Sequence, residues 1–337
     1  HYPLRRQRQM CIRDSFNIFA AVSSVDLVIG AVPGWLGYRV LEGAIKAGKH
    51  IVDISFCPED PLELDALARE QDVAAVVDCG VMPGLGGMIA AKLGRQLDEP
   101  RSLAIYVGGL PVERDGLLDY KAPFSPADVL EEYTRPARLR RNGSIETMPA
   151  LSELEQIDAP EVGRLEAFNT DGLRTLLGSF DWPEMKEKTL RWPGHARRIG
   201  LLKALGFLSP DPIGDSQTPP IRLTEQLLRK AWRYGPEERE FTFMRVEVGG
   251  LRDDRPVTLR GELLDYTDGA GNMSMARTTG LPAVAAAVLL ASGKLQVQRP
   301  QGTAAAAAVS GVICPEWLGS TTSFDFIEEY LGAAGIR

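Results

Sequence analysis

A short apolar run that ends in a turn rich in glycine and proline limits the folds open to this chain. Residues 74–77 read Ala-Ala-Val-Val, residues 78–87 hold four glycines and Pro83, and a helical apolar pattern follows from Met88. This order is typical of a buried parallel strand that feeds a tight turn and then a helix. Ligands in open α/β sheets bind outside the carboxyl ends of strands, so the turn is a candidate site wall. Glycines needed only for the backbone angles would give the same pattern.

Two earlier segments follow the same order. Residues 25–30 and 50–54 predict short buried strands, and helical spacing of apolar residues follows each of them. Strand–helix alternation with short loops predicts an α/β fold with a Rossmann-type doubly wound parallel sheet. The Gly-x-Gly-x-x-Gly turn that opens a dinucleotide-binding domain is absent from the sequence. We therefore expect residues 16–100 to form an incomplete Rossmann domain that lacks its first βαβ units.

The character of the sequence changes after residue 100. Strands are expected over residues 103–107, 164–169, 186–192, 241–248 and 257–263. The last two alternate with period two, which is typical of an antiparallel pair with one solvated face, and they could extend a sheet between subunits. We expect an α+β domain over residues 101–272 with a mixed or antiparallel sheet, followed by an Ala-rich helix over residues 278–291.

Composition excludes several classes of protein. The 337 residues suffice for two domains, and a net charge of −7 argues against a broad nucleic-acid or anionic membrane surface. The basic runs 135–141 and 191–198 are interpreted as solvated helix faces or local anion sites. The four cysteines are widely spaced with no CxxC pair, which disfavours disulfides and structural zinc and indicates a reducing cytoplasm. No apolar run approaches the roughly 20 residues of a membrane span.

The first residues do not fit the rest of the pattern. Residues 1–15 have no strand periodicity and no signal-peptide core, although they are basic at first. We expect them to be a non-native leader.

Three predicted strand ends share one edge of the parallel sheet. They are Ala31, Val32 and Pro33; Ser55, Phe56 and Cys57; and Met82, Pro83 and Gly84. Any one of them reads as an ordinary turn. Together they form a ledge on which a flat ring could lie, which favours a ligand site.

Several polar residues of the second domain are candidates for chemistry. Lys121 could act as a base if its neighbours desolvate it, or could be a surface lysine. Asn169, Thr170 and Asp171 follow a predicted strand, and form either a polar wall facing a cationic substrate group or an ordinary helix N-cap. Further candidates are Arg135, Arg174 and Arg191 as carboxylate clamps, His195 as an acid or base, and Cys57 and Cys79 as nucleophiles; each also has a purely structural interpretation.

Five runs of the sequence resemble the saccharopine dehydrogenase-like family. They cover residues 26–38 (DLVIGAVPGWLGY), 52–64, 77–87, 106–138 and 165–195. The two longest favour the lysine 6-dehydrogenase branch over the saccharopine reductases, which have Asn-Arg-Asp where this chain has Asn169-Thr170-Asp171. Residues 275–282 are similar to the family's return segment, so residues 273–337 are expected to pack on the cofactor domain.

The resemblance implies an NAD-dependent oxidoreductase. The implied reaction is oxidative deamination of the ε-amine of L-lysine to the 6-semialdehyde, which cyclises to piperideine-6-carboxylate, with release of ammonia. It leaves NADP open, because the family's ribose-reading acid is missing. The alternatives are a saccharopine- or carboxynorspermidine-type dehydrogenase and a non-catalytic Rossmann-fold binding protein. The implied partner is a small amino acid, and the implied form is a cytoplasmic homodimer or higher homo-oligomer without a bound metal.

The resemblance also implies roles for individual residues. Lys121 would be the catalytic base, with Asp171 and Asn169 orienting the amine or the attacking water. Arg191, and after it Arg174, would bind the α-carboxylate. The remaining substrate contacts would come from Thr189, Tyr120 and Thr170. The three strand ends, Thr279 and a turn at Gly108 would line the nicotinamide half of the cofactor.

Overall fold

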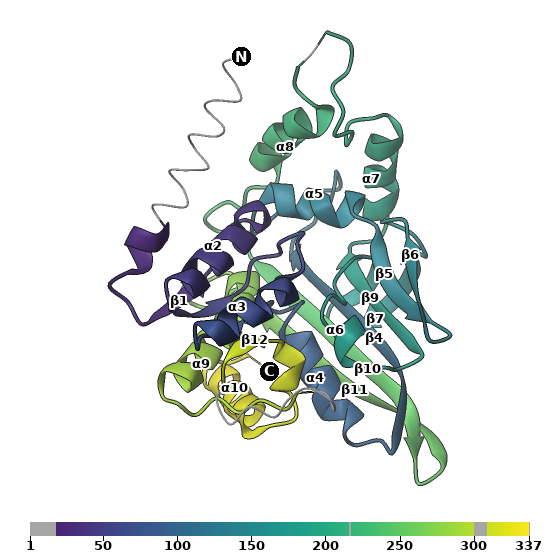
Figure 1. Ribbon diagram of the computed structural model, residues 1–337. Helices are drawn as coiled ribbons and strands as arrows, with labels where there is room; N and C mark the ends of the chain where they lie inside the picture. Colours follow the sequence, from purple (N-terminus) through teal and green to yellow (C-terminus); the bar gives the residue numbers. More distant parts are fainter. Residues whose placement is uncertain (1–17, 216, 300–308, 337) are drawn as a thin grey trace. The chain divides into compact units, whose positions relative to one another are not determined.

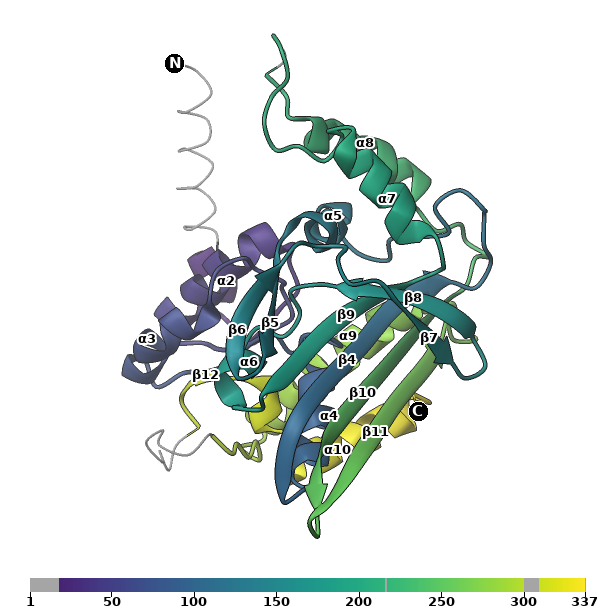
Figure 2. The ribbon, with the colours of Figure 1, turned by 90° about the vertical axis from the view of Figure 1, so that its right-hand side faces the viewer.

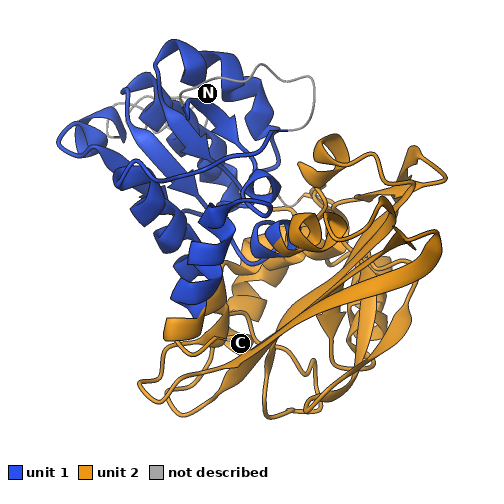
Figure 3. Cartoon of the chain, turned by 90° about the horizontal axis from the view of Figure 1, so that it is seen from below, with its two compact units in different colours: residues 1–88, 279–331 blue, residues 89–278, 332–337 orange. Residues whose placement is uncertain are grey.

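The computed structural model describes residues 18–215, 217–299 and 309–336 (Figure 1). The chain divides into two compact units, one of residues 1–88 with 279–331 and the other of residues 89–278 with 332–337 (Figure 3). We call them unit 1 and unit 2. The three boundaries fall inside helices α4 (Leu85–Gly94), α9 (Ser274–Ala291) and α10 (Thr322–Ala333). Unit 1 is therefore built from two segments that are far apart in the sequence.

Unit 1 contains a four-stranded parallel sheet. Its order is β1 (Leu27–Gly30), β2 (His50–Asp53), β3 (Ala74–Val76) and β12 (Gly311–Ile313). Every neighbouring pair is parallel. The three strands expected over residues 25–77 are confirmed, and so is the parallel sheet. The sequence analysis predicted no strand at β12, which is only three residues long and follows an Ala-rich stretch.

Helices α2 (Gly34–Lys46), η1 (Pro61–Leu64) and α3 (Asp65–Glu70) bury apolar side chains against this sheet. Helices η2 (Pro315–Trp317) and α10 (Thr322–Ala333) follow β12. Leu41, Ala44 and Ile45 of α2 follow helical spacing and pack with Ile51 and Val312 in one fully buried cluster. Burial of each large aliphatic side chain stabilises the unit by about 1.5–3 kcal/mol.

Unit 2 is built on an eight-stranded mixed sheet (Figure 2). Its strands are β4 (Glu99–Pro111), β5 (Ala137–Arg141), β6 (Ser144–Met148), β7 (Glu155–Ala159), β8 (Gly163–Asn169), β9 (Glu184–Arg191), β10 (Glu240–Arg252) and β11 (Arg255–Tyr266). The main order is β11-β10-β4-β9-β5-β6, and β8 joins β9 to β7. The pair β4–β9 is parallel and the others are antiparallel. The mixed sheet expected for this region is confirmed.

The turn between β10 and β11 shows why the sequence forms a hairpin there. Asp253 and Asp254 have φ angles of 50° and 57°, and Arg252 pairs with Arg255 across them. A two-residue hairpin turn requires positive φ at both positions, and Asp tolerates this better than most residues.

The helices of unit 2 are α5 (Pro126–Thr134), α6 (Leu176–Ser179), α7 (His195–Ala204) and α8 (Pro220–Ala231). Pro126 begins α5, and Ser125 before it makes no side-chain capping bond. The basic run 135–141 is strand β5, because its alternating arginines and apolar residues follow period two, so the helix-face interpretation was wrong.

Helix α9 is long and apolar enough, by length and composition alone, to cross a membrane. Of its 18-residue window, 44% is buried inside the structure, and a core helix of a globular protein passes the same test. It is therefore weak evidence for a span.

Candidate active site

One face of the sheet in unit 2 gathers polar side chains from several strands. Glu187, Thr189 and Arg191 alternate along β9, so they point to the same face. Thr189 lies beside Val107 of β4, and Val107 lies opposite Met244 of β10. All three strands therefore share this face. We call the buried polar side chains on it, with those that contact them, the polar cluster.

Arg191 lies at the centre of the polar cluster. Its side chain is 3% exposed and forms an ion pair with Glu132 of α5. Its Nε donates to the Tyr133 hydroxyl at 3.3 Å, and its Nη1 donates to the Leu190 carbonyl at 2.9 Å. The guanidinium also lies over the Tyr120 ring, 4.2 Å from its centroid. Of the residues predicted to bind substrate, Arg191 and Tyr120 are thus brought into contact, and the guanidinium is already engaged by a carboxylate.

Tyr133 links Arg191 to a fully buried histidine. The Tyr133 hydroxyl lies 2.9 Å from His195 Nε2, and His195 Nδ1 lies 2.8 Å from the Leu118 carbonyl. A carbonyl only accepts, so Nδ1 carries the proton and Nε2 accepts from Tyr133. Burial and the nearby Arg191 charge lower the pKa of His195 to about 3. His195 is therefore neutral and structural, as one of its two sequence interpretations expected.

Glu187 is a titratable residue of the site that the sequence analysis missed. Thr170 Oγ1 donates to Glu187 Oε2 at 2.6 Å, and the Gly172 N–H donates to the same oxygen at 3.1 Å. Thr189 Oγ1 lies 2.8 Å from Thr170 Oγ1. Burial, helped by the nearby Glu132 charge and opposed by the hydrogen bond from Thr170, raises the pKa of Glu187 to about 8. A carboxyl that titrates here can exchange a proton near neutral pH. Its one sequence signal is an acid two residues before Thr189 on a predicted strand.

The three consecutive residues Asn169, Thr170 and Asp171 do not form one polar wall. Thr170 joins Glu187 in the polar cluster. Asn169 is paired with Lys188, which places it on the opposite face, and its Nδ2 donates to Ser152 and Glu153. Alternation along the strand separates neighbours in this way.

The Asp171 carboxylate is paired with the guanidinium of Arg138. Arg138 donates to both carboxylate oxygens, each at 2.9 Å, and the Arg138 backbone N–H donates at 3.1 Å. A bidentate pair of this kind is a strong interaction. The N-cap alternative for Asp171 is wrong, because α6 begins only at Leu176.

Lys121 lies in the loop between β4 and α5. Its ammonium forms an ion pair with Glu238, and it lies 6.0 Å from the centroid of the Tyr234 ring. Its side chain is 18% exposed, so it is not a free surface lysine. Arg174, the second predicted carboxylate clamp, is 8% exposed with a φ of 43°.

Two glycines expected near the cofactor have structural reasons instead. Gly108 lies inside β4, not in a turn, so that expectation was wrong. A Cβ on Gly108 would lie 2.5 Å from the Leu190 carbonyl oxygen, which means that glycine permits the close approach of β9. Gly84 has a φ of 131°, and a Cβ there would lie 2.1 Å from the Gly80 oxygen. The turn itself requires Gly84.

The strand ends of unit 1 lie at one edge of its sheet. β1, β2 and β3 run parallel, so the segments that follow them lie at the same edge of the sheet. The residues at this edge that retain exposure are Ala31, Val32, Pro33, Phe56, Met82 and Pro83, while Ser55 and Cys57 are buried. Thr279 belongs to the same unit, since a Cβ on Gly80 would meet its methyl group at 3.2 Å. This is the edge at which the resemblance implies the nicotinamide half of a dinucleotide.

The described residues of unit 1 offer no glycine-rich phosphate loop. The turn after β1 leads into α2 with Pro33 at its N-cap, and proline has no N–H to give a phosphate. The Asp53 carboxylate already accepts two hydrogen bonds from Ser55, one from its backbone N–H at 2.9 Å and one from its hydroxyl at 3.0 Å. In residues 18–215, 217–299 and 309–336 no group of three His, Cys, Asp or Glu side chains is arranged to hold a metal ion.

Comparison with known proteins gives consistent matches. A family model for the saccharopine dehydrogenase C-terminal domain matches residues 80–320. Mitochondrial alpha-aminoadipic semialdehyde synthase of Mus musculus is 23% identical over 362 residues, covering 83% of this chain and 38% of that protein. Saccharopine dehydrogenase [NADP(+), L-glutamate-forming] of Pyricularia oryzae is 24% identical over 284 residues, covering 75% of this chain and 63% of that protein. The chain thus spans less than two thirds of either relative.

Two further matches cover more of the compared protein. Carboxynorspermidine synthase of Vibrio cholerae is 22% identical over 320 residues, covering 85% of this chain and 75% of that protein. The structure of apo saccharopine dehydrogenase (L-Glu forming) from Saccharomyces cerevisiae superposes with a TM-score of 0.72 at 18% identity, over 96% of this chain and 86% of that one. At this identity the likeness shows the fold, a parallel sheet with a second, mixed sheet.

Proposed function

This chain belongs to the saccharopine dehydrogenase family, and from that premise we propose that it serves a nicotinamide-dependent oxidation of an amine. The specific reaction we propose is oxidative deamination of the ε-amine of L-lysine to the 6-semialdehyde, which cyclises, with release of ammonia. The lysine assignment goes beyond the family, since the relatives' names specify saccharopine and carboxynorspermidine.

The observation that carries this proposal is the charge balance of the polar cluster. Glu187 is a buried carboxyl with a pKa of about 8. Glu240, whose pKa is raised by burial to about 7, lies farther along the same sheet face, opposite Pro111, whereas Glu187 lies beside Ile105. The guanidinium groups of Arg191 and Arg138 are each paired with a carboxylate. Such a site suits a cationic amine better than a substrate with several carboxylates.

The chemistry requires a proton acceptor beside the substrate nitrogen. When bound, the dinucleotide supplies the hydride acceptor. An ammonium nitrogen has no lone pair, so it must first lose a proton before the adjacent C–H bond can give up a hydride. Glu187 would take that proton on its carboxylate, while Thr170 and Thr189 hold the carboxylate in place. Water then attacks the resulting iminium carbon, and ammonia leaves.

Lys121 would have a different role from the one the resemblance implies. Its ammonium is paired with Glu238. Because the Lys121 ammonium is engaged by Glu238, we propose that Lys121 helps to orient the substrate and that Glu187 is the base.

The cofactor choice remains part of the proposal. The resemblance to the lysine-oxidising branch favours NAD, whereas the name of the fungal relative specifies NADP(+). The carboxynorspermidine-type reaction is a second candidate, because a carboxyl-rich cluster would also receive a polyamine.

A substrate panel tests the proposal. The purified chain is incubated with NAD or NADP and with L-lysine, saccharopine or carboxynorspermidine, and formation of the reduced nicotinamide is followed by absorbance. We expect lysine to be oxidised fastest, with NAD. Oxidation of saccharopine in preference to lysine would contradict the lysine assignment, and amine binding without turnover would favour a non-catalytic binding protein.

A further inference from the structure

One loop of unit 2 contains a buried carboxylate that the proposed mechanism does not use. Asp119 lies in the loop between β4 and α5, and its side chain is 0% exposed. Its φ of 52° lies in the left-handed region, which Asp and Asn adopt more readily than most other residues. Burial of a charge is unfavourable unless the charge is paired and hydrogen-bonded, so the partners of Asp119 indicate what it does.

Two arginines and the loop itself hold the Asp119 carboxylate. Its Oδ2 accepts from Arg114 Nη2 at 3.0 Å and from Arg198 Nη1 at 3.2 Å, and its Oδ1 accepts the Gly116 N–H at 2.7 Å. Burial opposes ionisation, but the hydrogen bonds from Arg114 and Gly116 lower the pKa of Asp119. Arg114 and Gly116 belong to the same loop, whereas Arg198 belongs to α7. The carboxylate therefore closes the loop on itself and fastens it to α7.

The residue before Asp119 is connected to Arg191 by a chain of hydrogen bonds. The Leu118 carbonyl accepts from His195 Nδ1 at 2.8 Å. His195 Nε2 accepts from the Tyr133 hydroxyl at 2.9 Å, and that hydroxyl accepts from Arg191 Nε at 3.3 Å. A displaced Leu118 carbonyl would leave the buried His195 N–H unpaired, which is unfavourable. The position of the loop and the arrangement of these side chains therefore depend on one another.

The two residues after Asp119 are residues of the proposed site. The Arg191 guanidinium lies over the Tyr120 ring, 4.2 Å from its centroid. The Lys121 ammonium is engaged by Glu238, and we have proposed that Lys121 helps to orient the substrate. A loop has no helix or sheet ladder to hold its backbone, so the bonds made by Asp119 supply that restraint next to both residues.

We propose that Asp119 is a positioning residue of the amine oxidation, because it holds the loop in the geometry that presents Tyr120 and Lys121 to the substrate. This inference rests on the proposed function, for which it names a residue that acts through its neighbours. Loss of the Asp119 charge would leave the guanidinium groups of Arg114 and Arg198 side by side without a carboxylate. Like charges repel, so the loop would open.

The test is lysine affinity and kinetics in Asp119→Asn, which removes the charge but keeps the shape and tolerates the left-handed φ. If the loop then holds its geometry one tenth of the time, L-lysine should bind about tenfold more weakly by calorimetry. KM for lysine should rise by a similar factor, while kcat and its pH profile stay as in the parent, because the base Glu187 is not displaced. A purely structural Asp119 would lower the thermal denaturation midpoint and leave KM unchanged.

Hydrogen exchange measures the loop itself. Aspartate side chains hold three backbone N–H groups of the loop, those of Gly116, Leu117 and Asp119. We expect residues 112–122 to exchange about tenfold faster in Asp119→Asn, and unchanged exchange would overturn the inference. Arg198→Gln is a second variant that keeps the aspartate. It should change affinity and exchange in the same direction by a smaller factor, because Arg114 still holds the carboxylate.

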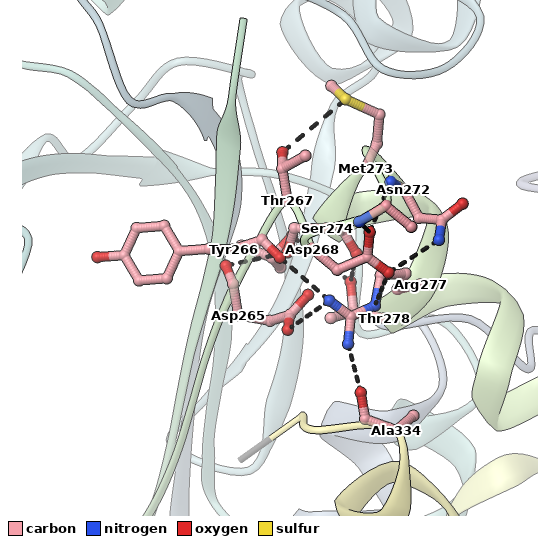
Figure 4. A network of polar contacts seen from close by, with 12 residues as sticks. Asp265, Tyr266, Thr267, Asp268, Asn272, Met273, Ser274, Arg277, Thr278 and Ala334 are labelled. Atoms are coloured by element: carbon pink, nitrogen blue, oxygen red, sulfur yellow. Dashed lines mark hydrogen bonds and ion pairs between the residues drawn. The ribbon is translucent and has the colours of Figure 1, made fainter. Parts of the chain in front are cut away.

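Asp268→Asn is the matched control, and Figure 4 shows its surroundings (Figure 4). Asp268 is also a loop aspartate of unit 2 that is held by backbone N–H groups and an arginine. Its Oδ1 accepts from Ala270 at 2.9 Å and from Asn272 at 2.8 Å, and its Oδ2 lies 3.9 Å from Arg277 Nε. This loop joins β11 to α9 and carries none of the predicted site residues. Asp268→Asn should therefore leave lysine affinity and the exchange of residues 112–122 unchanged.

The outcomes separate this inference from the proposed function. Lysine turnover by the parent, with unchanged KM in folded Asp119→Asn, would overturn the inference and leave the function standing. Lysine binding that weakens in Asp119→Asn without turnover in the parent would keep the positioning of the substrate and remove the oxidation. Equal weakening in Asp119→Asn and Asp268→Asn would overturn the inference, because it would reflect a general loss of stability. A parent that does not bind lysine would overturn both.

Discussion

The sheet edge of unit 1 and the polar face of unit 2 are built from different chemistry. The unit 1 edge consists of backbone turns and small apolar side chains, and the hydrogen bonds from Ser55 to Asp53 span only two residues. The polar face joins residues far apart in the chain, such as Arg191 with Glu132 and His195 with Leu118. The first region is the edge where the resemblance implies a flat ring, and the second holds a buried carboxyl with a raised pKa. Substitutions in unit 1 should therefore disturb local turns, whereas substitutions in the polar cluster should break contacts between distant parts of the chain.

The largest expected effect comes from breaking the buried ion pair of the polar face. Arg191→Met leaves the buried Glu132 carboxylate without its partner, and such a loss costs about 3–5 kcal/mol. Urea denaturation measures the change. Arg260→Met is the control, because its pair with Glu247 is half exposed and should contribute much less. Equal losses in the two variants would contradict the central place of Arg191.

A comparable test for unit 1 concerns a turn. Gly84→Ala forces a side chain into a φ of 131°, against the Gly80 oxygen, and should destabilise the protein by about 1–3 kcal/mol. Gly200→Ala is the control, since a Cβ there meets nothing within 4 Å and Ala favours helix α7 by about 0.5–1 kcal/mol. Thermal denaturation should move in opposite directions for the two. A Gly84 variant as stable as the parent would show that the turn does not need glycine.

A single hydroxyl tests the link between Arg191 and His195. Tyr133→Phe removes the donor to His195 Nε2 and should cost about 1–3 kcal/mol, because a buried acceptor is left unsatisfied. Tyr330→Phe is matched to it, since the Tyr330 hydroxyl makes no hydrogen bond within the described residues. Denaturant midpoints should fall for the first variant and stay for the second. The reverse result would mean that the tautomer assigned to His195 is wrong.

The smallest expected effect is a dependence of stability on pH. The pKa of Glu187 is raised by burial to about 8 in the folded state, from the ordinary glutamate value of 4.5. The folded protein then binds more protons than the unfolded one between these values, so stability falls as pH rises. Glu187→Gln should remove up to about 1.4 kcal/mol of that fall between pH 6 and pH 7. Urea denaturation at the two pH values measures it, and an unchanged slope would place Glu187 in a solvated setting.

The sequence predicted unit 1 well because its signals are local. Apolar runs such as residues 74–77 followed by glycine and proline mark strands, turns and helices over a few neighbours. Strand β12 was not predicted, because three residues are too few to show a strand periodicity. Its position in the sheet comes from its pairing with β3.

The polar face could be predicted only in part because its contacts are long-range. The resemblance pointed to Arg191, Tyr120, Thr170 and Thr189, which do come together in unit 2. It did not point to Glu187 or Glu240, since a glutamate on a strand looks like a solvated residue until its neighbours are known. Asn169 shows the opposite error, because strand alternation turns it away from Thr170.

The most direct test of the account is the pH dependence of kcat/KM for lysine oxidation in the parent and in Glu187→Gln. A carboxylate base must be ionised to accept a proton, so we expect the parent rate to rise as pH passes the Glu187 pKa of about 8. Glu187→Gln should lose about 10²–10⁴-fold in rate together with that rise. A variant that keeps the parent's rate and pH profile would contradict the assignment of the proton acceptor to the polar face of unit 2.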